Sequence, residues 1–132
     1  MRVVFDTNIF VSALVTPGGS GERAIQRILR GEDRLFLSRA LVDEVLSVLA
    51  RKFARDAQAL SRTALFLAEL GELTVPTASV SALADESDNR ILECSIAAGA
   101  ELVVTGDRAM LALGELEGVR LISLREYLEP TA

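Results

Sequence analysis

The chain has 132 residues, of which 50% are hydrophobic, and it carries a formal net charge of −5. A chain of this length forms one domain with a core of its own, so we expect a single domain over residues 1–132. The sequence contains no histidine and one cysteine, Cys94, which excludes Ser-His-Asp and Cys-His catalysis, an internal disulfide and a zinc site.

The distribution of apolar residues argues against a membrane protein. The chain lacks the run of roughly eighteen uncharged apolar residues that a membrane span requires. Its first residues, 1–6, become acidic too early for a signal peptide. We therefore expect a cytoplasmic protein with no membrane partner.

The first half of the chain alternates apolar strands with helices. Residues 2–5 predict a buried strand, residues 8–15 predict a short helix, and the glycine-rich stretch 16–21 predicts a loop. A helix over about 22–30 and a strand at 34–37 follow. Two longer helices are then expected, over about 39–53, after the N-cap residue Ser38, and over about 57–70.

The second half continues the alternation. The expected elements are a strand at 73–75, a helix over about 86–98, a strand at 101–105, a short helix near 108–113, a strand at 119–122 and a helical turn near 124–128. Strands that alternate with helices imply a mostly parallel sheet covered on both faces. The sequence therefore predicts a three-layer α/β/α sandwich of the Rossmann-like kind.

Two acidic residues directly follow or close predicted strands. Asp6 follows the apolar residues 3–5, and Asp107 follows the strand at 101–105. The carboxyl ends of parallel strands point into the crevice where open α/β sheets bind ligands, so at a topological switch point the two carboxylates would lie side by side. The alternative for each is that it only caps the helix that follows.

Two further acidic residues lie near helix starts on faces that point inward. Glu44 borders the apolar stripe formed by residues 41, 45, 48 and 49, and Asp88 precedes Ile91 and Leu92 by one helical turn. The alternative for Glu44 is that the aliphatic part of its side chain lies along the core while its carboxylate stays in solvent. For Asp88 the alternative is a place in the first turn of a helix that Asp85 caps.

Four carboxylates gathered at one edge of the sheet repel one another and need a cation to neutralise them. Oxygen ligands alone suit Mg²⁺ or Mn²⁺, which keep several waters and accept phosphate. The sequence thus predicts a divalent-metal site that acts on phosphodiesters, with metal-activated water as the nucleophile.

The order and spacing of these motifs resemble the PIN domain (PilT N-terminal) family, the fold of VapC-type toxins of toxin–antitoxin systems. The resemblance covers essentially the whole chain and depends on Asp6-Thr7-Asn8 with Ser12, on Glu44 within residues 41–46, on Asp88 ahead of residues 91–100, and on Thr105-Gly106-Asp107.

The resemblance implies a Mg²⁺- or Mn²⁺-dependent endoribonuclease. Asp6, Glu44, Asp88 and Asp107 match the family's acidic quartet, and the supporting polar positions are Asn8, Ser12, Asp85 and Thr105. Ala109 stands where a further Asp or Asn often follows the last acidic residue of the family. The resemblance therefore does not determine whether one or two metal ions bind. The resemblance also implies an RNA substrate, a cognate antitoxin and a homodimer formed through apolar surface on the helix at 57–70.

Arginine supplies all but one of the basic residues, Lys52 being the exception. Arg23, Arg27 and Arg30 form one stripe on a helix, which is either a solvated face or a track for the RNA backbone. Arg51 lies two turns after Glu44 and is either its ion-pair partner or a phosphate contact.

Three other classes of protein share some of these features. A HAD-like phosphatase needs a second aspartate where Asn8 stands, and a receiver-like domain needs a late lysine, whereas Lys52 lies mid-chain. The third rival, a PIN-fold module that binds RNA or a protein but cleaves nothing, is compatible with the sequence.

Overall fold

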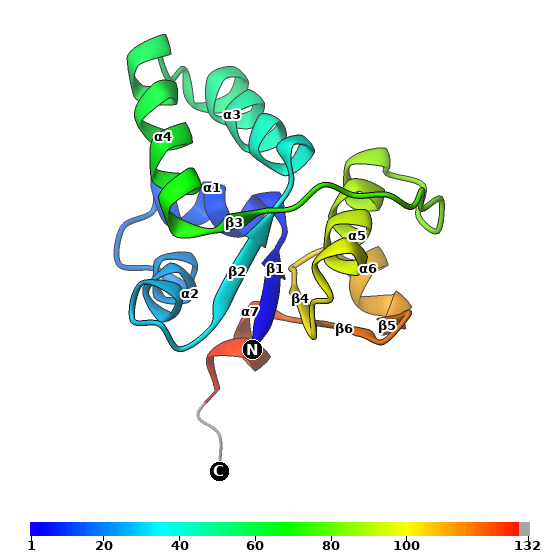
Figure 1. Ribbon diagram of the computed structural model, residues 1–132. Coiled ribbons are helices and arrows are strands. Elements are labelled where there is room, and N and C mark those ends of the chain that lie inside the picture. The colour runs from blue at the N-terminus through cyan, green and yellow to red at the C-terminus, as the bar shows by residue number, and fades with distance from the viewer. Residues whose placement is uncertain (130–132) are drawn as a thin grey trace.

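The computed structural model describes residues 1–129 and shows one sheet between two layers of helices (Figure 1). The strands are β1 (Arg2–Phe5), β2 (Arg34–Leu37), β3 (Glu72–Leu73), β4 (Leu102–Val104), β5 (Glu115–Leu116) and β6 (Val119–Ile122). The helices are α1 (Thr7–Val15), α2 (Ser20–Leu29), α3 (Arg39–Phe53), α4 (Ala57–Leu70), α5 (Glu86–Ala98), α6 (Arg108–Leu113) and α7 (Leu124–Leu128).

The sheet has the strand order β3-β2-β1-β4-β6-β5. All neighbouring pairs are parallel except β5 and β6, which are antiparallel. From β1 the chain proceeds to β2 on one side and later returns to β4 on the other, so the strand order reverses at β1. The predicted fold class, a mostly parallel three-layer α/β/α sandwich, is confirmed.

The strands bury alternate residues on the two faces of the sheet, as a period of two requires. One face packs against α1, α2, α3, α4 and α7, and the other packs mainly against α5 and α6 (Figure 1). In β1, for example, Val3 and Phe5 belong to the first core and Val4 to the second, and all three are fully buried. Strands covered on both faces become continuously apolar, which explains the Val-Val-Phe run.

Most predicted elements match the structure, with shifts of one or two residues at their ends. Helix α1 starts at Thr7, directly after its N-cap Asp6, and α2 starts at Ser20 within the predicted loop. Strands β3 and β4 are shorter than predicted. Ser38 caps α3 as expected, because its Oγ accepts the N–H of Leu41 at 3.3 Å.

Strand β5 was not predicted. It pairs with β6 through a two-residue turn, Glu117-Gly118, in which both residues have positive φ, 49° and 83°. This is the geometry of a type I′ hairpin, which usually carries Asn-Gly or Asp-Gly. Glu-Gly is a weaker signal, and a two-residue strand shows no periodicity.

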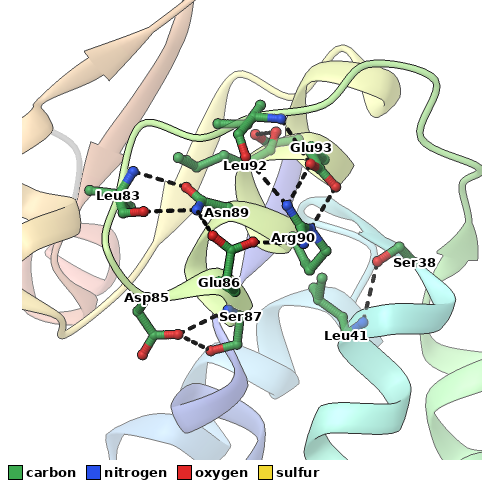
Figure 2. A network of polar contacts seen from close by, with 12 residues as sticks. Ser38, Leu41, Leu83, Asp85, Glu86, Ser87, Asn89, Arg90, Leu92 and Glu93 are labelled. Carbon is green, nitrogen blue, oxygen red and sulfur yellow. Dashed lines mark hydrogen bonds and ion pairs between the residues drawn. The ribbon is translucent and has the colours of Figure 1, made fainter.

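The segment between β3 and α5, residues 74–85, has no helix or strand but is held against α5 by side chains of that helix (Figure 2). The N–H of Val80 donates to Oε2 of Glu93 at 2.8 Å. The side-chain amide of Asn89 bonds both the N–H and the C=O of Leu83, at 3.0 and 2.8 Å. These bonds fix the approach of the chain to the start of α5.

Within residues 1–129, no helix combines the length and the apolar character that crossing a membrane requires.

Candidate active site

Asp6 lies between strand β1 and helix α1 and is the N-cap residue of α1. It is only 3% exposed, and its Oδ1 accepts hydrogen bonds from the backbone N–H groups of Asn8 and Ile9 at 2.8 and 3.2 Å. These bonds satisfy two donors that a helix start leaves free. Asp6 therefore caps α1, as the capping interpretation predicts, and its second oxygen faces the neighbouring strand.

Residues that follow β4 meet Asp6 because β4 is the parallel neighbour of β1. The hydroxyl of Thr105 donates to Oδ2 of Asp6, which also accepts the N–H of Gly106 at 3.4 Å. The same hydroxyl accepts the N–H of Asp107 at 3.0 Å. Since a buried carboxylate needs donors, these contacts hold Asp6 in one orientation and link it to Asp107.

Asp107 and Asp85 are also helix caps. Oδ1 of Asp107 accepts the N–H of Met110 at 2.9 Å at the start of α6. Oδ1 of Asp85 accepts the N–H and the hydroxyl of Ser87 at 2.9 and 2.6 Å at the start of α5. Within the described part of the chain, these hydrogen bonds reach only one oxygen of each carboxylate, so capping leaves the other oxygen for a ligand.

Asp88 lies in the first turn of α5 and is half-buried. Burial, and then the charges of Asp107, Asp85 and Asp6, raise the pKa of Asp88 from 3.8 to about 6. Burial also raises the pKa of Asp6, against the effect of its hydrogen bonds. The carboxylates that follow β1, begin α5 and follow β4 therefore lie near enough to one another for their charges to interact.

Helix α3 supplies the opposite wall. Its buried stripe contains the predicted residues Leu41, Val45, Val48 and Leu49. Glu44 borders this stripe and is half-buried, while Asp43 points to solvent. Oε1 of Glu44 lies 4.0 Å from Nη2 of Arg51, so Arg51 is an ion-pair partner of Glu44, as one of the two interpretations held.

One pocket, of about 200 Å³, contains all four predicted carboxylates; we call it the acidic pocket. It is lined by Asp6, Thr7, Asn8, Glu44, Val48, Arg51, Lys52, Asp85, Ser87, Asp88, Ile91 and Asp107. The pocket opens at the carboxyl ends of β1 and β4, where the strand order reverses, which is the position expected for the ligand site of an open α/β sheet. Thr105 lies beneath it, bonded to Asp6.

Five predicted site residues do not line this pocket: Thr105, which lies beneath it, Ser12 and the three arginines of α2. Ser12 faces helix α2: a Cβ atom on Gly21 would lie 3.1 Å from the Cβ of Ser12, which shows how closely the two helices cross. Arg23, Arg27 and Arg30 lie on α2, outside the pocket.

Arg27 is held at the other end of the sheet. Its Nη2 lies 3.4 Å from Oδ2 of Asp33, its Nη1 donates to the C=O of Tyr127 at 3.2 Å, and its guanidinium lies over the Tyr127 ring. Met1, near the start of β1, also pairs with Asp33 through its ammonium group, at 3.1 Å. The predicted RNA track along α2 therefore does not lead into the acidic pocket, because Arg27 is engaged at the amino ends of the strands.

Thr7, Ser87 and Lys52 line the pocket but were not predicted as site residues. Lys52 follows Glu44 by eight residues, about two helical turns, so helical spacing alone could have placed it on the same face. Thr7 and Ser87 follow the capping residues Asp6 and Asp85 closely, but neither position has a signal beyond that neighbourhood.

The donor set suits a hard divalent cation, which binds oxygen ligands. Among residues 1–129, no three Asp, Glu or Cys side chains are close enough together to hold a metal ion by themselves. Mg²⁺ commonly takes one or two carboxylates directly and keeps several waters. The pocket therefore fits a hydrated ion that some carboxylates would contact directly and others through water.

Fold and pocket together define a small α/β domain with an acidic site at the switch point of its sheet. The model of the PIN domain family matches residues 2–109. The chain is 24% identical over 117 residues to MJ1680, an uncharacterized protein of Methanocaldococcus jannaschii, in a match that covers 86% of this chain and 75% of that protein.

Two solved structures have the same fold. VapBC2 from Rickettsia felis, bound to a DNA fragment from its promoter, matches with a TM-score of 0.67 at 14% identity, over 93% of this chain and 98% of that chain. VapBC-1 from nontypeable Haemophilus influenzae matches with a TM-score of 0.67 at 13% identity, over 95% of this chain and 99% of that chain. Because the family model covers most of the sequence, the chain belongs to the PIN domain family.

Proposed function

We propose that this protein is a Mg²⁺- or Mn²⁺-dependent endoribonuclease that hydrolyses RNA phosphodiesters at the acidic pocket, as one nuclease domain over residues 1–132 that acts in the cytoplasm. One observation carries the proposal: carboxylates from the end of β1, from α3, from α5 and from the end of β4 line a single pocket, where burial and then the charges of Asp107, Asp85 and Asp6 raise the pKa of Asp88 to about 6. Membership of the PIN domain family supports it.

Asp6, Asp88 and Asp107 would hold the cation, with Glu44 completing its surroundings. When bound there, such an ion would supply a water of lowered pKa and would neutralise charge on the scissile phosphate. A single ion suffices for this role, and Ala109 offers no carboxylate for a second one.

The protein's own groups orient the reaction. The donors on both oxygens of Asp6 fix that carboxylate before any ligand arrives, so no reorganisation is needed. Arg51 and Lys52, on the α3 wall, would contact RNA phosphates on either side of the scissile bond. Asn8, exposed at the pocket, can donate to a phosphate oxygen.

The test is cleavage of single-stranded RNA in the presence of Mn²⁺. Asp6→Asn should lower the rate at least about a hundredfold, since loss of even an outer-shell partner of a metal costs about 10–100-fold. Asp43→Asn removes the same charge from a solvent-facing position beside Glu44 and should cleave as the unmodified protein does. Cleavage by a folded Asp6→Asn protein at the normal rate would refute the mechanism.

The two similar structures are VapBC complexes, and on this likeness we propose that the protein is the toxin of a toxin–antitoxin pair with a cognate antitoxin as partner. An apolar groove of about 250 Å³ between α1, α2 and α4, lined in part by Phe10, Leu14 and Phe66, offers a surface for such a partner. Expression of the protein alone in bacteria should arrest growth, and the Asp6→Asn variant should not.

One observation favours a second candidate function, a PIN-fold module that binds RNA or protein without cleaving. The acidic side chains are widely spaced: within residues 1–129, no three of them could hold a metal ion by themselves. Titration with Mn²⁺ followed by the cleavage assay separates the two functions, because a binding module would retain RNA while leaving it intact at every Mn²⁺ concentration.

A further inference from the structure

A second cavity, of about 220 Å³, lies beside the acidic pocket; we call it the side cavity. It is lined by Thr7, Ala40, Leu41, Glu44, Glu86, Ser87 and Arg90. Three of these residues, Thr7, Glu44 and Ser87, also line the acidic pocket. If the scissile phosphate of an RNA strand entered the acidic pocket, the adjoining nucleotide would therefore lie at the side cavity.

The polar wall of the side cavity is rigid because Arg90 is anchored (Figure 2). Its Nε and Nη2 each donate to the carboxylate of Glu93 at 2.8 Å, and Nη2 also donates to the C=O of Val80 at 3.3 Å. Its Nη1 donates to Oε2 of Glu86 at 3.2 Å. A guanidinium has five N–H groups, so these four bonds leave one further N–H, on Nη1, to donate to a ligand.

The charges of the side cavity decide which part of a nucleotide it accepts. The carboxylates of Glu44 and Glu86 both line it, and they would repel a phosphate group. The apolar wall formed by Ala40 and Leu41 favours a neutral, flat group instead. The size also fits, because a cavity of roughly 150 Å³ in another protein takes up benzene.

We infer that the side cavity binds the nucleobase next to the scissile phosphate and selects the lactam edge, an N–H beside a C=O, that guanine and uracil share. The inference rests on the proposed function, since RNA brings the base there. The Nη1 of Arg90 and the carboxylate of Glu86 stand together as donor and acceptor. Arg90 donates to the base C=O, and Glu86 accepts the base N–H.

Adenine and cytosine lack this edge. Each presents a ring nitrogen acceptor where guanine and uracil present an N–H. That nitrogen would face the carboxylate of Glu86 without a proton between them, so the ring nitrogen would lack a donor and the two acceptors would repel each other. A site built to pair with an N–H rejects a ligand that lacks it more strongly than an apolar site rejects a change of size.

The test maps the cleavage sites of the whole chain on a random single-stranded RNA pool with Mn²⁺. The expected result is guanine or uracil, by roughly tenfold over adenine and cytosine, at one fixed position beside the cleaved bond. The ratio of guanine to uracil tells whether the exocyclic amino group of guanine adds to recognition. Cleavage without any base preference at that position would overturn the inference while the nuclease function stands.

Glu86→Gln is the diagnostic variant. It removes the charged acceptor but leaves Arg90 its bonds to Glu93 and Val80, so the fold of α5 is retained. In this variant, the ratio of cleavage at guanine or uracil to cleavage at adenine or cytosine should fall towards one. Glu69→Gln removes the charge of an exposed side chain on α4 and should keep the base preference of the unmodified protein. An unchanged preference in Glu86→Gln would contradict the assignment.

A binding measurement separates this inference from the proposed function. Neutral nucleosides are titrated into the metal-free protein, and the Arg90 Nε–H signal is followed by NMR. Guanosine and uridine should shift it at lower concentration than adenosine and cytidine, and Glu86→Gln should abolish the difference. If the protein cleaves no RNA but shows this order, the nuclease proposal fails and the base site stands; equal binding of all four nucleosides overturns the base site.

Discussion

Asp88 is the residue on which the charges of the site act most strongly. Its carboxylate is half-buried and lies near Asp107, Asp85 and Asp6, so its ionised form is disfavoured in the folded protein and its pKa is about 6. In the unfolded chain the group ionises near its ordinary value of 3.8. The folded protein therefore holds this proton more tightly than the unfolded chain does.

This difference predicts the effect of Asp88→Asn on stability. The contribution of Asp88 to folding is fully present below pH 3.8 and is lost as the pH rises through 6. In metal-free buffer, Asp88→Asn should therefore raise the thermal unfolding midpoint at pH 8 and have little effect at pH 4. Differential scanning calorimetry at both pH values measures this.

Asp43→Asn is the control, because its carboxylate is exposed on the neighbouring helix and away from the pocket. It should leave the pH dependence of the midpoint unchanged. If Asp88→Asn instead destabilised the protein at pH 8, Asp88 would be held by favourable contacts, and the repulsion among the carboxylates would be absent.

At the residue scale, the sequence predicted the acidic positions but posed capping and ligation as alternatives. The structure shows capping bonds to Oδ1 of Asp6, Asp85 and Asp107, and the ligand role of these carboxylates is our proposal. A helix that begins directly after a strand needs a side-chain acceptor for its first N–H groups. That position lies at the carboxyl edge of the sheet, where ligands bind. Ser12 was assigned to the site from the motif alone, and the motif could not reveal that Gly21 lets α2 approach that position.

At the scale of elements, the segment 74–85 and helix α5 act as one unit. Asn89 is fully buried and bonds both backbone groups of Leu83, while Glu93 bonds the N–H of Val80. A segment of this length without helix or strand would otherwise be mobile. Its attachment determines where Asp85 and Asp88 enter the acidic pocket.

Asn89→Ala tests this attachment. It leaves the N–H and C=O of Leu83 without their partner, so we expect the free energy of unfolding to fall by about 1–3 kcal/mol. Urea denaturation measures this loss, and hydrogen exchange should show faster exchange at the Leu83 amide. Ser79→Ala, in the same segment but exposed, should change neither quantity. Unaltered exchange at Leu83 in Asn89→Ala would show that other contacts hold the segment.

The elements themselves were mostly predictable because hydrophobic period, caps and breakers act locally. What those signals cannot supply is the direction in which a helix face points relative to the rest of the sheet. The stripe of Arg23, Arg27 and Arg30 has the right period for a binding track, yet Arg27 pairs with Asp33 at the amino ends of the strands. The sequence also could not predict the hydrogen-bond partners of Asn89 and Glu93, because residues 79–83 show no helical or strand periodicity.

At the scale of the whole molecule, the reversal of strand order at β1 creates the site. It makes β1 and β4 neighbours, so Asp6 and Thr105-Gly106-Asp107 meet although about a hundred residues separate them. The sequence predicted this meeting from the rule that ligands bind at switch points. It could not predict which residues form the side cavity, because that cavity depends on how α3 and α5 pack.

The exposed apolar surface on α4 leads to a prediction about assembly. Leu65 is 65% exposed in the middle of this helix, and we propose that it lies in a homodimer interface. Leu65→Glu should convert a dimer to a monomer in size-exclusion chromatography with light scattering, because it places a charge in a buried contact. Gln58→Glu, exposed on the same helix, should remain dimeric. A monomeric unmodified protein would exclude this role for α4.

The most direct measurement of the central claim is calorimetric titration of Mn²⁺ into the metal-free protein at pH 7.5, above the pKa of Asp88. If the converging carboxylates form one cation site, the unmodified protein binds Mn²⁺, and Asp88→Asn and Asp107→Asn each weaken binding at least about tenfold. Asp43→Asn should bind as the unmodified protein does. Absence of Mn²⁺ binding, or equal binding by all three variants, would contradict the claim.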